Sequence, residues 1–192
     1  MFGGETKIFI GAKDRALRKR IKSILQRQGY LIVGEAEDGA TALRIIRRLM
    51  PDLVILDKDL PGFSGLELTR IIKGDKIAPV ILLTSSWEQP LFEKTKDSWV
   101  FAFLVKPIQE GHLLSTASFV LQAFQKMICL ERQVDELKES IETRKLVERA
   151  KGFLMKKLSL SESEAYRRMQ QQSMDQCLSM RKIAQAIISN YE

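Results

Sequence analysis

The sequence predicts an α/β fold, a doubly wound five-stranded parallel sheet, followed by a coiled-coil helix and a small three-helix all-α domain. Two observations carry this prediction. Up to Pro107, apolar runs of strand length alternate with segments of helical length and period, and after Pro107 no strand signal returns. Strands that alternate with helices form parallel sheets through right-handed crossovers. Ligands of such sheets bind outside the carboxyl ends of the strands.

The predicted strands are apolar on both faces, as expected for strands that helices cover on both sides. They are KIFIG (7–11), YLIVGE (30–35), DLVILD (52–57), PVILLT (79–84) and VFAFLV (100–105). Helical periodicity predicts helices over 14–28, 39–49, 65–73 and about 89–97, with a fifth after the last strand. Gly29 and Pro51 follow the first two helices, where helix ends favour such residues.

Length and composition exclude several classes of protein. The chain has 192 residues, and its two cysteines, Cys129 and Cys177, cannot form a disulfide framework. One histidine with two cysteines is also a poor basis for a zinc site. No apolar run approaches the roughly 20 residues that span a bilayer, and no signal peptide is visible. We therefore expect a cytoplasmic protein without a membrane partner.

The C-terminal segment is basic, within a chain whose net charge is +7. From Thr143 onward, 10 basic residues stand against 5 acidic ones. A basic segment favours an anionic partner, with nucleic acid the first candidate. The alternative is a solvated basic face without a partner.

A heptad pattern begins at Val120 and predicts a coiled-coil helix. The alternative is a long amphipathic helix that packs on its own domain, and self-packing could come first with a dimer seam after it. We expect domains at 1–118, 119–142 and 143–192, with a homodimer formed through the coiled coil. Positions a are Val120, Met127, Val134 and Ile141, and positions d are Ala123, Leu130 and Leu137.

Three predicted strands end in residues that suit phosphoryl chemistry. The third ends in Asp57, the fourth in Thr84, and Lys106 follows the fifth. Parallel strands bring these side chains to one rim of the sheet. A carboxylate can attack phosphorus, while a hydroxyl and an ammonium can bind the oxygens of the phosphoryl group.

These segments resemble a response-regulator receiver domain, a flavodoxin-like fold. The matching stretches are VGEAEDGATAL, LVILDKDLPGFSGLEL, PVILLTS and FLVKP, in this order along the chain. The resemblance implies that Asp57 accepts phosphate and that Thr84 and Lys106 contact it. It also implies that Phe103 is the aromatic residue that changes rotamer on activation, and that the Lys106–Pro107 bond is cis.

The segment after the first strand departs from the receiver pattern. Receivers place two adjacent acids there to hold Mg²⁺, and those positions are Ala12 and Lys13 here. Magnesium needs carboxylate oxygens in near-octahedral geometry, and Asp14 is one position too late. We therefore expect no cofactor and regard Mg²⁺ binding as doubtful. If the Lys13 ammonium reaches Asp57, it would occupy the place of the metal.

Two alternatives to phosphorylation stay open. The DKD sequence at 57–59 also resembles the first motif of haloacid-dehalogenase-type phosphatases, but the later acidic motif and the cap domain of those enzymes are missing. The other alternative is an inherited scaffold in which Asp57, Thr84 and Lys106 transfer no phosphate. We expect that the protein is not an enzyme.

The C-terminal segment resembles the ANTAR domain, an RNA-binding three-helix module that follows receiver domains in transcription antiterminators. The stretches that match are RKLVERAKGFLM, LSESEAYRRMQQQSM and MRKIAQAI. Ser161 and Glu164 have capping-box spacing before a helix over 162–172, and Ser179 is a plausible N-cap for the last helix. The candidate RNA contacts are Arg144, Lys145, Arg149, Lys151, Lys156, Tyr166, Arg167, Arg168, Arg181 and Lys182.

The two resemblances imply a response regulator that binds stem-loops in leader RNA and prevents transcription termination. Its receiver is not expected to depend on ordinary Mg²⁺-driven phosphorylation, and a sensor kinase or sensor protein could act upstream. The alternatives are a protein–protein signalling adaptor with a degenerate receiver and a conventional dimer activated by phosphorylation. A DNA-binding regulator is weaker, because MRKIAQAI offers only Arg181 and Lys182 to base edges.

Overall fold

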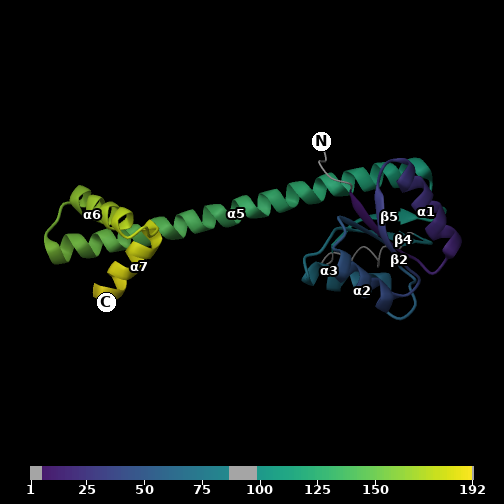
Figure 1. Ribbon diagram of the computed structural model, residues 1–192, viewed down its shortest axis with the longest axis horizontal. Coiled ribbons are helices and arrows are strands. Elements are labelled where there is room, and N and C mark those ends of the chain that lie inside the picture. The colour runs from purple at the N-terminus through teal and green to yellow at the C-terminus, as the bar shows by residue number, and fades with distance from the viewer. Residues whose placement is uncertain (1–5, 87–98, 192) are drawn as a thin grey trace. The chain divides into compact units, whose positions relative to one another are not determined.

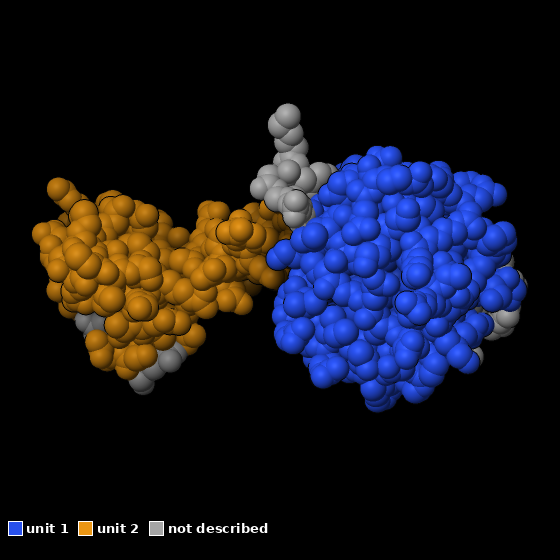
Figure 2. Space-filling model, turned by 45° about the vertical axis from the view of Figure 1, so that its right-hand side comes forward, with its two compact units in different colours: residues 1–126 blue, residues 127–192 orange. Residues whose placement is uncertain are grey.

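The computed structural model describes residues 6–86 and 99–191, and the chain folds into two compact units (Figures 1 and 2). The first unit is Met1–Lys126 and the second is Met127–Glu192. The helix predicted over about 89–97 lies outside the described residues. Each unit has a hydrophobic core of its own, so the two are described separately.

The first unit contains a five-stranded parallel sheet with the order β2-β1-β3-β4-β5, which confirms the predicted fold class. β3, the central strand, is buried at every position, as is β4 beside it. β2 and β5 form the two edges. The strands are β1 (Lys7–Gly11), β2 (Leu31–Ala36), β3 (Leu53–Asp57), β4 (Val80–Thr84) and β5 (Val100–Val105).

Helices cover both faces of this sheet, because each strand contributes apolar side chains to two separate cores. One core joins the sheet to α1 and the first part of α5, and the other joins it to α2 and α3. The helices are α1 (Arg15–Arg27), α2 (Gly39–Leu49), α3 (Gly65–Gly74), α5 (Glu110–Leu158), α6 (Glu162–Asp175) and α7 (Met180–Tyr191).

The heptad of α5 divides between two environments. Val120, at the start of the heptad, is fully buried in the core of the first unit, where the helix packs on its own domain. The later heptad residues Leu130, Val134, Leu137 and Ile141 are exposed. An apolar stripe with a 3.5-residue period and no covering partner keeps a coiled-coil seam open as a prediction.

One helix, α5, is long and apolar enough by length and composition alone to cross a membrane. The sequence analysis predicted no such run. Core helices share this composition, and the same helix places Leu113, Ala117 and Leu121 in the receiver core.

The second unit packs its part of α5 against α6 and α7. Its core contains Ala150, Met169 and Ala184, all fully buried. Ser161 caps α6 in the predicted capping box: its hydroxyl accepts from the Glu164 N–H, and the Glu164 carboxylate accepts from the Ser161 N–H. Such reciprocal caps satisfy N–H groups that have no partner inside the helix.

A nearly buried lysine joins α5 to the start of α6. The Lys151 ammonium lies 2.8 Å from a carboxylate oxygen of Glu148 and 2.8 Å from one of Glu162. It also sits 5.9 Å from the ring centroid of Tyr166. Hydrogen bonds to Glu148 and Glu162 raise the pKa of Lys151, and the bond to Lys151 lowers the pKa of Glu162. The positive charge of Lys151 is therefore balanced by acids of the same unit.

Gly65 should be important for the stability of the first unit, because a Cβ at this position would clash with the backbone carbonyl of Asp57. Gly65→Ala should lower the free energy of unfolding by about 1–3 kcal/mol, since overpacking against rigid backbone costs that much. Urea unfolding followed by tryptophan fluorescence measures it, because both tryptophans precede residue 127. The matched control is Gly74→Ala in the same helix, where a Cβ meets nothing within 4 Å. An equal loss in both variants would contradict the close approach.

Acid should weaken the second unit. The pKa values of Glu162 and Glu164 are both lowered, by the Lys151 ammonium and by the Ser161 cap respectively. A lowered folded-state pKa stabilises the fold above the ordinary value of about 4.3, and that stability is lost as pH falls through the folded-state pKa. Amide hydrogen exchange in α6 between about pH 6 and pH 3 measures the loss.

The double variant Glu162→Gln/Glu164→Gln should be less stable near neutrality and should respond less to acid. Glu192→Gln at the chain end is the control and should keep the acid response of the parent chain. A double variant with an unchanged acid response would show that other carboxylates carry it.

Candidate phosphorylation site and RNA-binding surface

Asp57 is a buried carboxylate whose charge is balanced by Lys106 among the residues that the structure describes. It ends β3, the strand between β1 and β4, and it is 4% exposed. One carboxylate oxygen lies 2.6 Å from the Lys106 Nζ, and the other accepts from the Asp59 N–H at 3.2 Å. A buried charge needs such partners, because an unpaired one costs several kcal/mol. The carboxylate is therefore held in one orientation at the rim of the sheet.

Thr84 and Lys106 reach the same rim from the neighbouring strands, as the sequence predicts. Thr84 ends β4 and is 1% exposed, and its hydroxyl donates to the Ser86 carbonyl at 2.9 Å. The Lys106 N–H donates to the Thr84 carbonyl at 2.8 Å, so the ends of β4 and β5 are tied together. The Lys106–Pro107 bond is cis, as expected. Phe103 on β5 is half-buried against the core under α2 and α3.

The loop between β1 and α1 contains one acid, Asp14, and this acid caps a helix. Ala12 is fully buried, and its N–H donates to the Ala36 carbonyl at 3.0 Å. Asp14 caps α1, with its carboxylate accepting from the Ala16 N–H at 2.7 Å. Among residues 6–86 and 99–191, no group of three or more His, Cys, Asp or Glu side chains could hold a metal ion. Asp14 is thus committed to helix capping, and Asp57 to the pair with Lys106.

The ammonium that reaches Asp57 in this structure is that of Lys106, at 2.6 Å, and not that of Lys13. Lys13 is exposed, and its ammonium forms no ion pair within the described part of the chain. Sequence reasoning missed Arg18, which fixes this loop instead. Its guanidinium donates to the carbonyls of Ala12 and Lys13, the second at 3.0 Å. The only sequence signal for this role of Arg18 was its position, about one turn into the helix that follows a buried strand.

The candidate RNA contacts differ widely in their freedom to reach a ligand. Lys151 is the clear correction, since it is 7% exposed and saturated by Glu148 and Glu162. Arg181 is half-buried and pairs with Glu139 at 3.4 Å and Glu142 at 3.3 Å. The exposed members are Arg144, Lys145, Arg149, Lys156, Tyr166, Arg167, Arg168 and Lys182.

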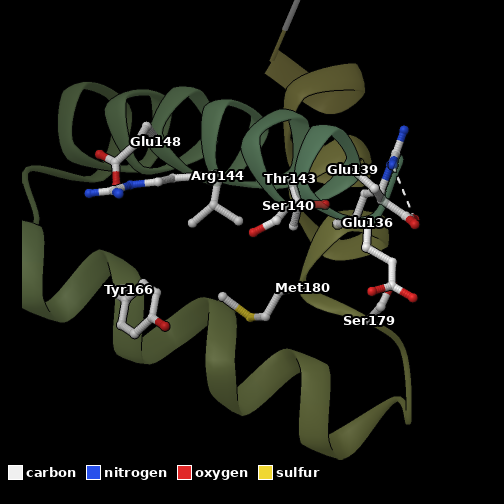
Figure 3. A pocket seen from close by; sticks show the side chains of 11 residues that line it. Glu136, Glu139, Ser140, Thr143, Arg144, Glu148, Tyr166, Ser179 and Met180 are labelled. Carbon is white, nitrogen blue, oxygen red and sulfur yellow. Dashed lines mark hydrogen bonds and ion pairs between the residues drawn. The ribbon is translucent and has the colours of Figure 1, made fainter. Parts of the chain in front are cut away.

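A pocket of about 680 Å³ opens beside Tyr166 in the second unit (Figure 3). Arg144 and the hydroxyls of Ser140 and Thr143 project from α5 on one side, and Tyr166 and Met180 lie on the other. The lining also contains Glu136, Glu139 and Glu148 against the two cations Arg144 and Arg181, so the pocket has no surplus of positive charge for a phosphate. Its aromatic face, guanidinium plane and hydroxyls suit an unstacked base instead. The sequence analysis did not identify this pocket, because its walls come from segments distant in the chain.

Comparison with protein families matches both units. The response regulator receiver domain matches residues 8–118, and the ANTAR domain matches residues 135–188. The transcriptional regulatory protein PdtaR of Mycobacterium tuberculosis is 34% identical over 182 residues, which cover 95% of this chain and 89% of that protein. A putative transcriptional regulator of Pseudomonas aeruginosa is 32% identical over 120 residues, covering 62% of this chain and 58% of the relative.

Solved structures resemble the first unit. The chemotaxis protein CheY4 of Vibrio cholerae superposes with a TM-score of 0.58 at 25% identity, covering 61% of this chain and 99% of that one. A DNA-binding response regulator of the LuxR family from Staphylococcus aureus gives 0.57 at 27% identity, covering 60% and 98%. With the fold, the rim of β3, β4 and β5 and both family matches in agreement, the chain belongs to the response regulators that join a receiver domain to an ANTAR domain.

Proposed function

We propose that this response regulator acts in the cytoplasm by binding stem-loops in leader RNA and preventing transcription termination. The observation that carries the proposal is the exposed group formed by Tyr166, Arg167 and Arg168 on α6 of the ANTAR unit. Arg167 and Arg168 form no ion pair with any described residue, so their charge is available to phosphates. Tyr166, in the same turn of α6, adds an exposed aromatic ring on another face of the helix.

RNA loops suit this surface better than duplex DNA. Proteins read single-stranded RNA loops by stacking unpaired bases on aromatic or guanidinium planes and by hydrogen bonds to base edges. The pocket beside Tyr166 offers such a plane together with Arg144. Reading DNA would require side chains that reach base edges in the major groove. α7 begins with Arg181 engaged by Glu139 and Glu142, which argues against that use.

A homodimer through α5 would present two such units to RNA. Leu130, Val134, Leu137 and Ile141 are between 47% and 63% exposed and follow a heptad spacing. Parallel pairing of two copies would bury this stripe as a and d positions. Two ANTAR units on one dimer would then engage two stem-loops, so avidity would favour transcripts that carry a pair of them.

The receiver of this protein would be switched without Mg²⁺-dependent phosphorylation. Ala12 and Lys13 supply no carboxylate, Asp14 is used as a cap, and Arg18 already brings a positive charge to the loop. The Asp57 carboxylate is neutralised by Lys106. A sensor kinase or sensor protein could still act on this unit by binding, and the protein itself would catalyse no reaction.

RNA binding should depend on Arg167 and Arg168. Gel shifts with a paired-hairpin leader RNA should show tighter binding than with duplex DNA of equal length. Arg167→Gln/Arg168→Gln should weaken RNA binding and reduce the slope of log K against log salt by about 0.7 to 0.9 for each lost phosphate contact. The matched control is Arg44→Gln/Arg48→Gln, which removes the same charge from α2 of the receiver.

Equal affinity for RNA and DNA would contradict the proposal. The signalling-adaptor alternative predicts a different pattern. Leu137→Asp in the α5 stripe would abolish the regulatory activity in cells, while Arg167→Gln/Arg168→Gln would leave that activity intact.

Phosphorylation should fail under conditions that modify ordinary receivers. Incubation with acetyl phosphate and Mg²⁺, followed by intact mass measurement, should show no stoichiometric gain of phosphate, because the loop lacks metal-holding acids. A receiver with both acids intact is the positive control. A gain of one phosphate that Asp57→Asn removes would establish the conventional phosphorylation-activated dimer instead.

A further inference from the structure

A groove lined by basic residues runs along α1 of the receiver, next to the edge strand β2. It encloses about 650 Å³, and five cations face one carboxylate within it. α1 contains no acidic residue at all. The cations are Arg15, Arg18, Lys19, Lys22 and Arg27, and the carboxylate is that of Glu35.

Part of this charge is balanced internally and part is not. Glu35 lies 2.6 Å from Lys22 and 3.9 Å from Arg18, so two cations share its charge. Arg27 pairs with Glu110 at 2.9 Å. Arg15 and Lys19 are exposed and form no ion pair with any residue that the structure describes.

The spacing of these cations forms a row. Arg15, Lys19 and Lys22 recur at about one turn of α1, so successive charges stand about 5.4 Å apart along the helix axis. Ser23 and Gln26 continue the row with neutral groups that can donate to phosphate or ribose oxygens. A single row of this kind suits one phosphodiester strand.

The lining also argues against a protein in this groove. Every one of its residues is charged or polar. Protein interfaces are built around a core that is poor in charge and rich in aromatic residues and methionine. Nucleic acid binding, by contrast, draws most of its affinity from cations on phosphates.

We propose that this groove binds the phosphate backbone of single-stranded RNA that flanks the stem-loops. The inference rests on the proposed RNA-binding function of the ANTAR unit. It assigns the receiver a direct contact with the transcript, independent of Asp57. Contacts between cations and phosphates carry no sequence information, so binding here should depend little on base sequence.

The test compares two RNAs with the full-length protein by fluorescence anisotropy over a range of salt. One RNA is the paired hairpin alone, and the other carries a single-stranded extension of about 12 nucleotides, within the size of known single-strand sites. The extension should raise affinity and steepen the salt dependence. Arg15→Gln/Lys19→Gln should abolish the gain and lower the slope on the extended RNA by about 1.4, which is two contacts at about 0.7 each.

Hairpin-only binding should be unchanged in that variant. Arg44→Gln/Arg48→Gln is again the matched control, since it removes equal charge from α2 and should keep the full gain. Both substituted pairs are exposed, and circular dichroism with thermal unfolding checks that the variants fold. If the control loses the gain equally, or if Arg15→Gln/Lys19→Gln keeps it, the groove does not bind RNA.

The outcomes separate this inference from the proposed function. If Arg167→Gln/Arg168→Gln loses the hairpin and Arg15→Gln/Lys19→Gln behaves as the parent chain, only the groove is refuted. If the parent chain binds neither RNA, both proposals fall. If the parent chain binds the extended RNA but not the paired hairpin, and Arg15→Gln/Lys19→Gln removes that binding, the groove proposal stands and hairpin recognition fails.

Discussion

The burial of one carboxylate constrains most of the receiver. Asp57 stands at the end of β3, a strand with no exposed residue, and its charge must be met by a partner held in place. Lys106 meets it from β5 at 2.6 Å, and the Lys106 N–H is anchored on the end of β4. α3 can begin against the backbone carbonyl of Asp57 only because Gly65 has no Cβ. The strand order and the hydrogen bond between the ends of β4 and β5 therefore position the partner of one buried charge.

The sequence predicts the strands and helices well because their signals are local. Every strand of the sheet is found within a residue or so of its apolar run, and α2 has the predicted bounds. Burial on both faces makes strand runs continuous, which separates them from the amphipathic helices. The capping box of α6 is also local, since its two partners are three residues apart. Such features require no knowledge of the tertiary fold.

The site is predicted only in part, because charge partners are chosen in three dimensions. Sequence reasoning brings Asp57, Thr84 and Lys106 to one rim, but it cannot decide whether Lys13 or Lys106 pairs with the carboxylate; the structure places Lys106 there. Lys151 carries the same formal charge as its exposed neighbours, but Glu162, eleven residues away, completes its burial. Whether a basic residue serves a ligand or its own fold depends on acids that only packing brings near.

The cationic side chains of this protein fall into two groups, those that pair within the fold and those that do not. Some cations stabilise the fold: Arg18 donates to the β1–α1 loop, Lys151 joins two helices, and Arg181 pairs with an acid of α5. Others, such as Arg167 and Arg168, have no partner among the described residues. A net charge of +7 therefore says little about partners until these two groups are separated.

The burial of Ala12 limits which side chains this position can hold. Its side chain has no access to solvent, and the strand before it pairs directly with β3, which ends in Asp57. A carboxylate introduced at position 12 alone would be a second buried negative charge on a strand next to the first, and like charges so placed disfavour ionisation of both. A metal site built at this rim would therefore need several substitutions at once, together with release of Arg18 from the Ala12 and Lys13 carbonyls.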